Sequence, residues 1–149
     1  MNICLVGSSG GHLAHIMNMK SFWQKHDRFF VTFKLPDTKD LGETERCYWA
    51  YHPTTRNIPN LLKNFVLALK VISKEKPDLV LTTGAGVALP FFIIGKIFGA
   101  KTIYIEVYDR IDYASLTTKL CKPFTDSLLV QWEEQLEFSK DAQLIGRLM

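Results

Sequence analysis

The chain has 149 residues, close to the commonest size of a single domain, so one hydrophobic core is expected. With 47% hydrophobic and 22% charged residues it has an ordinary globular composition, which excludes wholesale disorder, a collagen and a coiled coil. The formal net charge of +3 suits a surface that meets phosphates or anionic lipid, but it falls short of a nucleic-acid footprint. We therefore expect no nucleic-acid partner.

In chain order, short β-branched or aromatic runs alternate with longer helical patterns, as is typical of a parallel sheet wrapped by helices. The sequence predicts a strand at residues 3–6, a glycine-rich turn at 7–11, a helix to about residue 24, and a second strand at 29–33. A loop at 35–45 and a third strand at 47–51 follow.

A long helix is predicted from residue 59 to about residue 76, because apolar residues recur there at helical spacing: Leu61, Leu62, Phe65, Val66, Leu69 and Ile72. Further strands are predicted at 79–81, 102–107, 127–130 and 143–145, with a crossover helix at 87–98 and a short polar helix at 132–140. The predicted fold class is α/β, a doubly wound, Rossmann-like parallel sheet that forms one domain over residues 1–149.

Cysteine spacing and apolar runs exclude several other classes of protein. Cys4, Cys47 and Cys121 form no CxxC pair and are odd in number, so neither a disulfide framework nor a zinc site is predicted. The first residues have no basic leader, and the longest apolar stretch, residues 87–98, is too short to cross a bilayer. We expect no signal peptide, membrane span, metal or cofactor.

Ligands of an open parallel sheet bind beyond the carboxyl ends of its strands. Gly10 and Gly11 follow the first strand and stand directly before a helix, where backbone amides and the helix dipole can hold a diphosphate. A tight turn that requires positive φ explains the same glycines equally well. Residues 82–86 form a second such turn, so the candidate diphosphate-binding residues are Ser9, Gly10, Gly11, Thr83, Gly84 and Gly86.

These turns do not match the best-known nucleotide motifs. No GxGxxG aligns on the first turn, and the second strand ends at Phe33 and Lys34 without the acid that would bind a ribose. No glycine is followed by the Lys-Ser or Lys-Thr of a P-loop. A nicotinamide-dependent enzyme and a P-loop nucleoside triphosphatase are therefore both disfavoured.

Two titratable side chains at this edge are candidate catalytic residues. His12 lies in the first helical turn, from which an imidazole can reach a bound hydroxyl, although it could instead only cap the helix. Glu106 ends an apolar strand and is either a functional carboxylate or a buried acid paired with Arg110. We name His12 and Glu106 as candidate catalytic residues and Arg110 as a candidate acceptor-binding residue.

Five short motifs occur in a characteristic order: Gly7 to His12, Thr83 to Gly86, Tyr104 to Glu106 with Arg110, the SLLVQW run at 127–132, and residues 144–148. With them the chain resembles, over nearly all its length, the membrane-anchor subunit family of the split N-acetylglucosaminyltransferase of the dolichol pathway and its bacterial capsule and exopolysaccharide counterparts. That family is similar to the amino-terminal half of the two-domain (GT-B) glycosyltransferases that make lipid II.

The resemblance implies a glycosyltransferase subunit that is active only with its partner. Gly10, Gly11 and His12 would face an undecaprenyl-diphosphate-linked sugar acceptor, and Glu106 and Arg110 would line the cleft. A catalytic subunit would carry the nucleotide-sugar site. Eukaryotic members begin with a membrane-spanning helix that this sequence lacks, so we expect peripheral association with the cytoplasmic face of the cell membrane. A non-catalytic activator and a stand-alone nucleotide-binding enzyme are the alternatives.

Two surfaces are predicted for these partners. A membrane-binding surface is predicted from Phe91, Phe92, Ile94, Ile97, Phe98, Leu67 and Val71 near Lys96, Lys101, Lys119 and Lys122, the alternative being a buried crossover helix. Contact with the catalytic subunit is predicted for Arg147, Leu148 and Met149, which combine a charge with apolar anchors. A frayed terminus is the alternative there.

Overall fold

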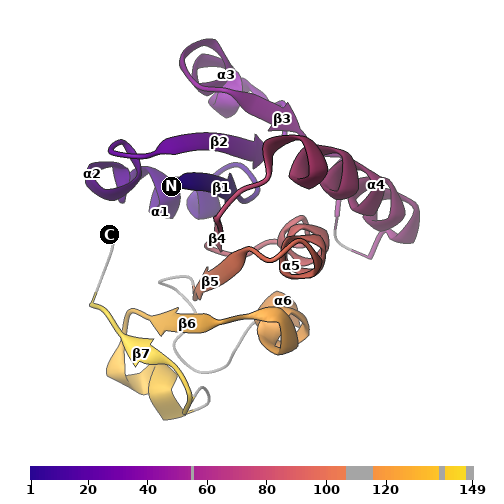
Figure 1. Cartoon of the computed structure of the whole chain (residues 1–149). Coiled ribbons are helices and arrows are strands. Elements are labelled where there is room, and N and C mark those ends of the chain that lie inside the picture. The colour runs from indigo at the N-terminus through magenta and orange to yellow at the C-terminus, as the bar shows by residue number, and fades with distance from the viewer. Residues whose placement is uncertain (55, 107–115, 138–139, 147–149) are drawn as a thin grey trace.

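The computed structural model describes residues 1–54, 56–106, 116–137 and 140–146. Its centre is a seven-stranded sheet in the order β3-β2-β1-β4-β5-β6-β7 (Figure 1). The strands are β1 (Asn2–Val6), β2 (Asp27–Thr32), β3 (Cys47–Trp49), β4 (Leu79–Thr82), β5 (Lys101–Ile105), β6 (Ser127–Val130) and β7 (Gln143–Leu144).

Every neighbouring pair of strands is parallel. The chain builds outward from β1 to β3, crosses back to β4 beside β1, and then continues outward to β7. This order confirms the predicted doubly wound α/β fold. The winding reverses between β1 and β4, where Val6 pairs with Thr82, and the carboxyl ends of these two strands flank the crevice in which such sheets bind ligands.

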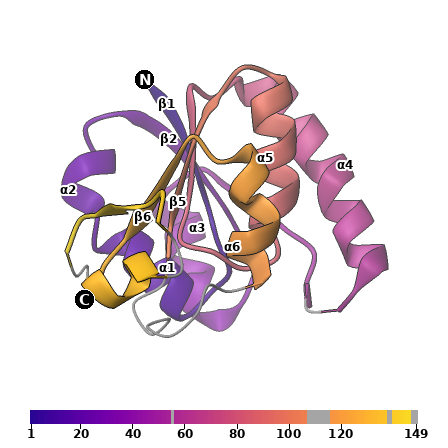
Figure 2. The ribbon, with the colours of Figure 1, turned by 90° about the horizontal axis from the view of Figure 1, so that it is seen from below.

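Helices cover both faces of the sheet (Figures 1 and 2). The helices α1 (Gly11–Met17) and α2 (Lys20–Trp23) pack on one face over Ile3 and Leu5. The helices α4 (Ile58–Glu75), α5 (Ala88–Ile97) and α6 (Leu116–Cys121) pack on the other face over Cys4 and Val6. Successive residues of β1 therefore serve opposite faces, as the period of a strand requires.

Short elements account for most differences from the prediction. The helix predicted to residue 24 is divided at Met19 into α1 and α2. The predicted loop at 35–45 contains the 3-10 helix η1 (Pro36–Thr38) and α3 (Lys39–Thr44), and no helix was predicted at α6. The polar helix predicted at 132–140 is the 3-10 helix η3 (Glu133–Glu137), and a further 3-10 helix, η2 (Lys122–Phe124), follows α6. None is long enough to show a helical period.

The long helix α4 confirms the predicted element but buries a different side. It begins where the Asn57 side chain accepts a bond from the Asn60 amide, and it ends before Lys76, which has left-handed geometry. Buried Asn64 bonds both backbone groups of Tyr51 and so fixes the rotation of the helix. In consequence the helix buries Asn64, Ala68, Val71 and Ile72, whereas Leu62, Val66 and Leu69 of the predicted stripe are exposed.

The crossover helix α5 is mostly buried, which corrects the predicted membrane surface. Phe91, Phe92 and Val71 are in the core, because α5 lies between α4 and α6 (Figure 2). Ile97 and Phe98, at the end of the helix, are exposed as that prediction requires. Within the described residues, no helix combines the length and the apolarity that crossing a membrane would need.

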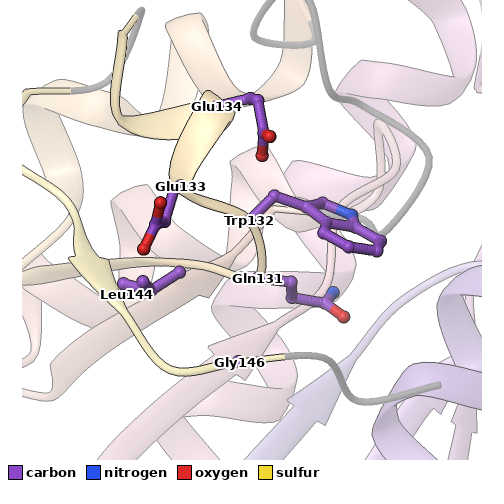
Figure 3. A pocket seen from close by; sticks show the side chains of 6 residues that line it. All are labelled: Gln131, Trp132, Glu133, Glu134, Leu144 and Gly146. Carbon is purple, nitrogen blue, oxygen red and sulfur yellow. The ribbon is translucent and has the colours of Figure 1, made fainter.

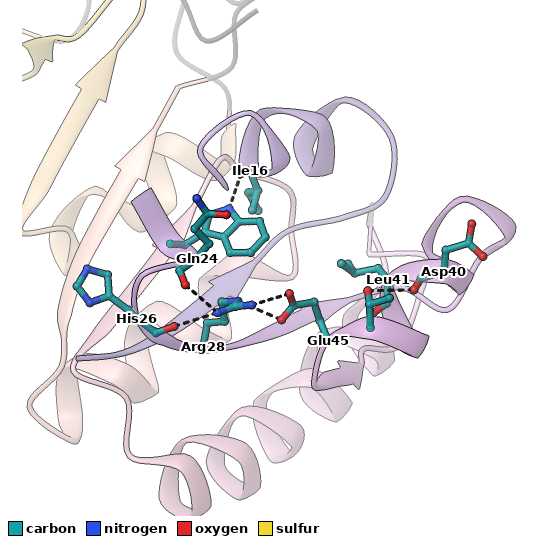
Figure 4. Close-up of polar contacts among 9 residues, drawn as sticks. Ile16, Gln24, His26, Arg28, Asp40, Leu41 and Glu45 are labelled. Carbon is teal, nitrogen blue, oxygen red and sulfur yellow. Dashed lines mark hydrogen bonds and ion pairs between the residues drawn. The ribbon is translucent and has the colours of Figure 1, made fainter. Parts of the chain in front are cut away.

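A cluster of polar contacts ties α2, β2 and the end of α3 together (Figure 4). Arg28 donates two bonds to the Glu45 carboxylate, at 2.9 and 3.1 Å, and others to the carbonyls of Gln24 and His26. The Trp23 indole donates to the Ile16 carbonyl at 2.8 Å. These contacts hold α2 and the end of α3 against β2, the neighbour of β1 in the sheet.

Candidate functional site

The first glycine turn connects β1 to α1 and faces open space. Gly10 has a φ of +76°, which favours glycine, and a Cβ added at Gly10 or Gly11 would meet no heavy atom within 4 Å. Both residues are exposed, and Ser9 is half-buried. The Gly10 amide donates to the Asp37 carboxylate at 2.9 Å. The Asp37 carboxylate therefore already accepts a bond from Gly10, one of the backbone amides that the sequence predicted to bind a diphosphate.

The second turn is joined to His12 by two reciprocal hydrogen bonds. The Nδ1 atom of His12 lies 3.0 Å from the Thr83 carbonyl oxygen, and the Thr83 hydroxyl donates to the His12 carbonyl at 2.6 Å. A carbonyl oxygen can only accept, so the ring nitrogen facing it, Nδ1, carries a proton. In the neutral ring Nε2 is then the basic nitrogen, which is the form that a general base requires.

Gly84 allows the His12 ring to approach the second turn this closely. A Cβ at Gly84 would lie 3.0 Å from both the His12 Cε1 atom and the Tyr104 hydroxyl, and the φ of +118° also disfavours any side chain. The Gly84 amide donates to the Thr82 hydroxyl at 3.0 Å. A Cβ at Gly86 would lie 3.0 Å from Thr54. These two glycines therefore serve close packing within the chain.

Glu106 lies in a buried polar network at the carboxyl ends of β5 and β6. The residue is 1% exposed, and its carboxylate accepts a bond from the Thr118 hydroxyl at 2.5 Å. The backbone carbonyl of Glu106 accepts a bond from the side-chain amide of Gln131 at 2.9 Å. The side-chain oxygen of Gln135 in turn accepts a bond from the backbone amide of Gln131. The acid is thus held from α6 and from β6, beneath the surface. Arg110, its predicted partner, lies outside the described residues.

Sequence reasoning missed Asp37, Thr118 and Gln135 as parts of this edge, and it named Tyr104 only as a motif residue. The SLLVQW run pointed to Gln131 only as a motif residue, and the buried acid at Glu106 was the one signal that a polar partner must exist. Thr118 could not be chosen as that partner without α6. The structure does bring His12, Thr83 and Gly84 together, as the two-turn prediction requires.

A pocket of about 550 Å³ lies at the ends of β6 and β7 (Figure 3). Its lining residues are Gln131, Trp132, Glu133, Glu134, Leu144 and Gly146. The two carboxylates in this lining disfavour an anionic ligand. The predicted partner-binding residues, Arg147, Leu148 and Met149, lie outside the described residues but directly follow Gly146.

The described cysteines and acids offer little other chemistry. Cys4 and Cys121 are buried, and burial raises the pKa of Cys121 to about 12, so its thiol is protonated at neutral pH. Within the described ranges, no group of three or more His, Cys, Asp and Glu residues could hold a metal ion. The chemistry of this edge therefore centres on His12 and the open first turn.

Comparison with known proteins identifies the chain. The family described as "Oligosaccharide biosynthesis protein Alg14 like" matches residues 35–148. The chain belongs to the Alg14-like family. The UDP-N-acetylglucosamine transferase subunit alg14 of Schizosaccharomyces pombe is 35% identical over 75 residues, which are 47% of this chain and 36% of that protein. The human ALG14 subunit is 23% identical over 180 residues, covering all of this chain and 83% of that protein.

Bacterial proteins also match. The undecaprenol N-acetylglucosamine transferase of Clostridium perfringens, named as acting on N-acetylmuramyl-(pentapeptide) pyrophosphoryl-undecaprenol, is 32% identical over 81 residues. Those residues are 54% of this chain and 22% of that protein. The chain thus spans less than half of this relative and of the fission yeast protein.

Solved structures share the fold of this Alg14-like chain at low sequence identity. MurG of Acinetobacter baumannii superposes with a TM-score of 0.78 at 14% identity, over 97% of this chain and 45% of that one. The MnaA–UDP structure of Staphylococcus aureus gives a TM-score of 0.73 at 13% identity, over 99% of this chain and 44% of that one. The fold is therefore that of one Rossmann-like domain of a GT-B protein, as the resemblance implied.

Proposed function

We propose that this Alg14-like chain is the acceptor-binding half of a two-component polysaccharide glycosyltransferase. In the proposal it binds a sugar linked to undecaprenyl diphosphate, and a separate catalytic subunit carries the nucleotide-sugar site. The observation that carries the proposal is the family itself, since the fission yeast and human relatives are named as subunits of a UDP-N-acetylglucosamine transferase. The Clostridium relative, named as acting on an undecaprenol pyrophosphate, supports the class of acceptor.

The geometry around His12 supports a catalytic contribution. Its Nε2 atom would accept the proton of the acceptor hydroxyl as that oxygen attacks the anomeric carbon of the donor sugar. The new glycosidic bond forms as the bond to the nucleoside diphosphate breaks, and the nucleoside diphosphate leaves. The acceptor diphosphate would lie over Gly10 and Gly11, where no side chain intrudes, and would compete with Asp37 for the Gly10 amide.

The other candidate residues take supporting roles in this proposal. Thr83 and Gly84 hold the His12 ring, and Gly86 packs the second turn against Thr54. Glu106 fixes the ends of β5 and β6 from beneath, since its carboxylate is covered. Arg110 and Ser9 stay candidates for the diphosphate.

The alternative is a non-catalytic activator that recruits and stabilises the catalytic subunit. Two observations favour it: Glu106 is buried in a polar network, and the amides of Gly10 and Gly84 are both bonded within the chain. A variant that carries both His12→Ala and Glu106→Ala separates the two functions. If its complex assembles normally and retains full turnover, the chain is a scaffold.

Reconstitution tests the proposal directly. The chain, the gene product encoded beside it, and the two together would be assayed with nucleotide sugars and an undecaprenyl-diphosphate-linked acceptor. We expect transfer only when both proteins are present. Robust turnover by this chain alone would overturn the two-component proposal, and so would the absence of both a complex and transfer.

Peripheral association with the cytoplasmic face of the cell membrane belongs to the same proposal. The acceptor is a lipid, so a subunit that binds its diphosphate must work at the membrane surface. Capsule or exopolysaccharide synthesis is the setting in which such a bacterial subunit would act.

A further inference from the structure

The outward side of α4 exposes large aliphatic residues in a continuous row. Ile58, Leu62, Val66 and Leu69 are 69, 59, 55 and 50% exposed. Their spacing of four, four and three residues places them on one side of a helix with 3.6 residues per turn. We call these residues the α4 face.

The fold does not need the α4 face for its own core. The opposite side of the helix already packs on the sheet and on α5 through Ala68, Val71 and Ile72. Figures 1 and 2 both show α4 as the outermost helix on its side of the sheet, with α5 on its inner flank. A contiguous apolar surface beyond what the core requires marks a site of interaction.

Positive charge borders this surface. Lys63, Lys70 and Lys74 are exposed and lie in one row beside the α4 face, since they are spaced by seven and four residues. The acid of the helix, Glu75, is engaged by Arg46 at 3.0 Å and by the Tyr48 hydroxyl. The helices α4, α5 and α6 together contain this one acid and five lysines, which are Lys63, Lys70, Lys74, Lys96 and Lys119.

We propose that the α4 face lies in the interface of an anionic lipid membrane, with the lysine row at the headgroups. Aliphatic residues beside lysines are the composition of a helix that lies in the plane of a membrane interface. Protein interfaces instead favour aromatic residues and arginine and are depleted in lysine. The inference rests on the proposed function, because it names the surface that would bring the subunit to its lipid-linked acceptor.

The position of α4 suits this role. The helix begins at Ile58, four residues after Thr54, and Thr54 packs against Gly86 in the second glycine turn. The Asn60 side chain, in the first turn of α4, bonds the Pro53 carbonyl and holds this connection. Docking through the α4 face therefore places the candidate acceptor site beside the membrane surface.

Vesicle flotation of the full chain tests the inference. We expect the chain to float with vesicles of phosphatidylglycerol and phosphatidylethanolamine at low salt, and to float less at high salt or with phosphatidylcholine alone. The double variant Leu62→Gln/Val66→Gln is expected to reduce the ratio of bound to free protein by about tenfold or more, because each side chain loses apolar burial in the lipid. The variant Lys63→Gln/Lys70→Gln should reduce it chiefly at low salt.

Matched controls use the opposite side of the molecule. Phe22→Gln removes an exposed apolar residue on α2, and Lys20→Gln/Lys25→Gln removes the same charge as the lysine variant. Both should float like the unchanged chain. All the substituted residues are exposed, so melting temperatures should stay close to that of the unchanged chain, and this is checked first.

Three results would overturn the inference. The first is an unchanged chain that stays in the soluble fraction with anionic vesicles, and the second is a Leu62→Gln/Val66→Gln variant that floats normally. The third is a dimer in sedimentation that this variant converts to a monomer without a change in flotation, which would assign the face to a second copy. In the reconstituted complex, the α4 variants should still transfer sugar to a short-chain, water-soluble acceptor. If neither the unchanged chain nor any variant supports this transfer, the result counts against the proposed function and not against the α4 face.

Discussion

At the scale of single residues, Gly84 and Gly11 are glycines for different physical reasons. Gly84 is required by the fold, because His12 and Tyr104 approach within 3.0 Å of where a Cβ would be. Gly11 has no such neighbour, and its backbone needs no positive φ. A glycine that the fold does not need, at an exposed helix start beside a candidate site, points to a ligand that approaches the backbone closely.

This contrast gives a paired prediction. Gly84→Ala should lower the free energy of unfolding by about 2–4 kcal/mol, from the combined cost of positive φ and overpacking. Gly11→Ala should change it by less than about 1 kcal/mol yet weaken binding of a lipid-diphosphate acceptor. Urea unfolding and acceptor titration of the two variants provide the measurements. A Gly11→Ala variant that binds the acceptor normally would leave that glycine without a ligand-binding role.

His12 allows a second residue-scale test, because its two nitrogens have separate roles. In His12→Asn the side-chain amide can still donate to the Thr83 carbonyl in place of Nδ1, whereas nothing replaces Nε2. We expect near-normal melting and a fall in turnover of about 10²–10⁴-fold, the typical contribution of a general base. Turnover close to normal in a fully assembled complex would show that His12 only joins the two turns.

At the scale of elements, the sheet could be predicted because its strands are short apolar runs bounded by turns. The predicted ends of the strands also put His12 and the two glycine turns at the carboxyl edge of the sheet, where the structure has them. The rotation of α4 could not be predicted, since the helix is apolar on two sides and the burial is decided by Asn64, which bonds Tyr51 across the chain. The partner of Glu106 stayed hidden for a similar reason. Thr118 lies on a short helix without periodicity, and only tertiary contact identifies it.

Asp126 joins three elements and makes stability depend on pH. Its carboxylate bonds Lys96, at the end of α5, at 2.6 Å and the Thr102 amide of β5 at 2.8 Å. The bond from Lys96, followed by those from Thr102, holds the pKa of Asp126 below its usual 3.8. A lowered pKa in the folded state means that this stabilisation is fully present above pH 3.8 and is lost as the pH falls through the lower value.

Asp126→Asn should therefore lower the melting temperature at pH 7, by an amount that corresponds to about 1 kcal/mol. The difference from the unchanged chain should narrow as the pH is taken below 3.8, because the natural carboxyl is then also uncharged. Thermal unfolding at several pH values, with Asp141→Asn as a control on an exposed acid, measures this. A constant difference at all pH values would mean that the charge of Asp126 contributes nothing.

At the scale of the whole molecule, the surfaces of this domain point in different directions. The glycine turns and His12 occupy the carboxyl edge at the switch between β1 and β4, and the α4 face occupies the outer flank of the helical layer. The pocket at the ends of β6 and β7 occupies the far side of the same edge. Acceptor, membrane and partner could therefore be bound together without competing for one surface.

The end of the described chain, after β7, is the surface that we expect to meet the catalytic subunit. Leu144 and Ile145 are exposed, and Leu144 lines the same pocket as Trp132. Residues 147–149 follow Gly146, another residue of that lining, in the sequence. In a GT-B arrangement the second domain faces the carboxyl edge of the sheet, so we predict that this apolar segment and the Arg147, Leu148 and Met149 that follow it in the sequence contact the catalytic subunit. Arg147 can pair bidentately with a partner carboxylate, and apolar anchors beside such a charge dominate many interfaces.

Deleting residues 147–149 should leave the melting temperature unchanged and weaken the Kd for the catalytic subunit by about tenfold or more, because one charge and two apolar side chains are lost. Calorimetric titration of the purified partner measures this. The Leu62→Gln/Val66→Gln variant is the control, since α5 lies between α4 and α6 and the α4 face is remote from β6 and β7, so its loss should leave the Kd unaltered. An unchanged Kd in a deletion variant that melts normally would exclude the tail from the interface.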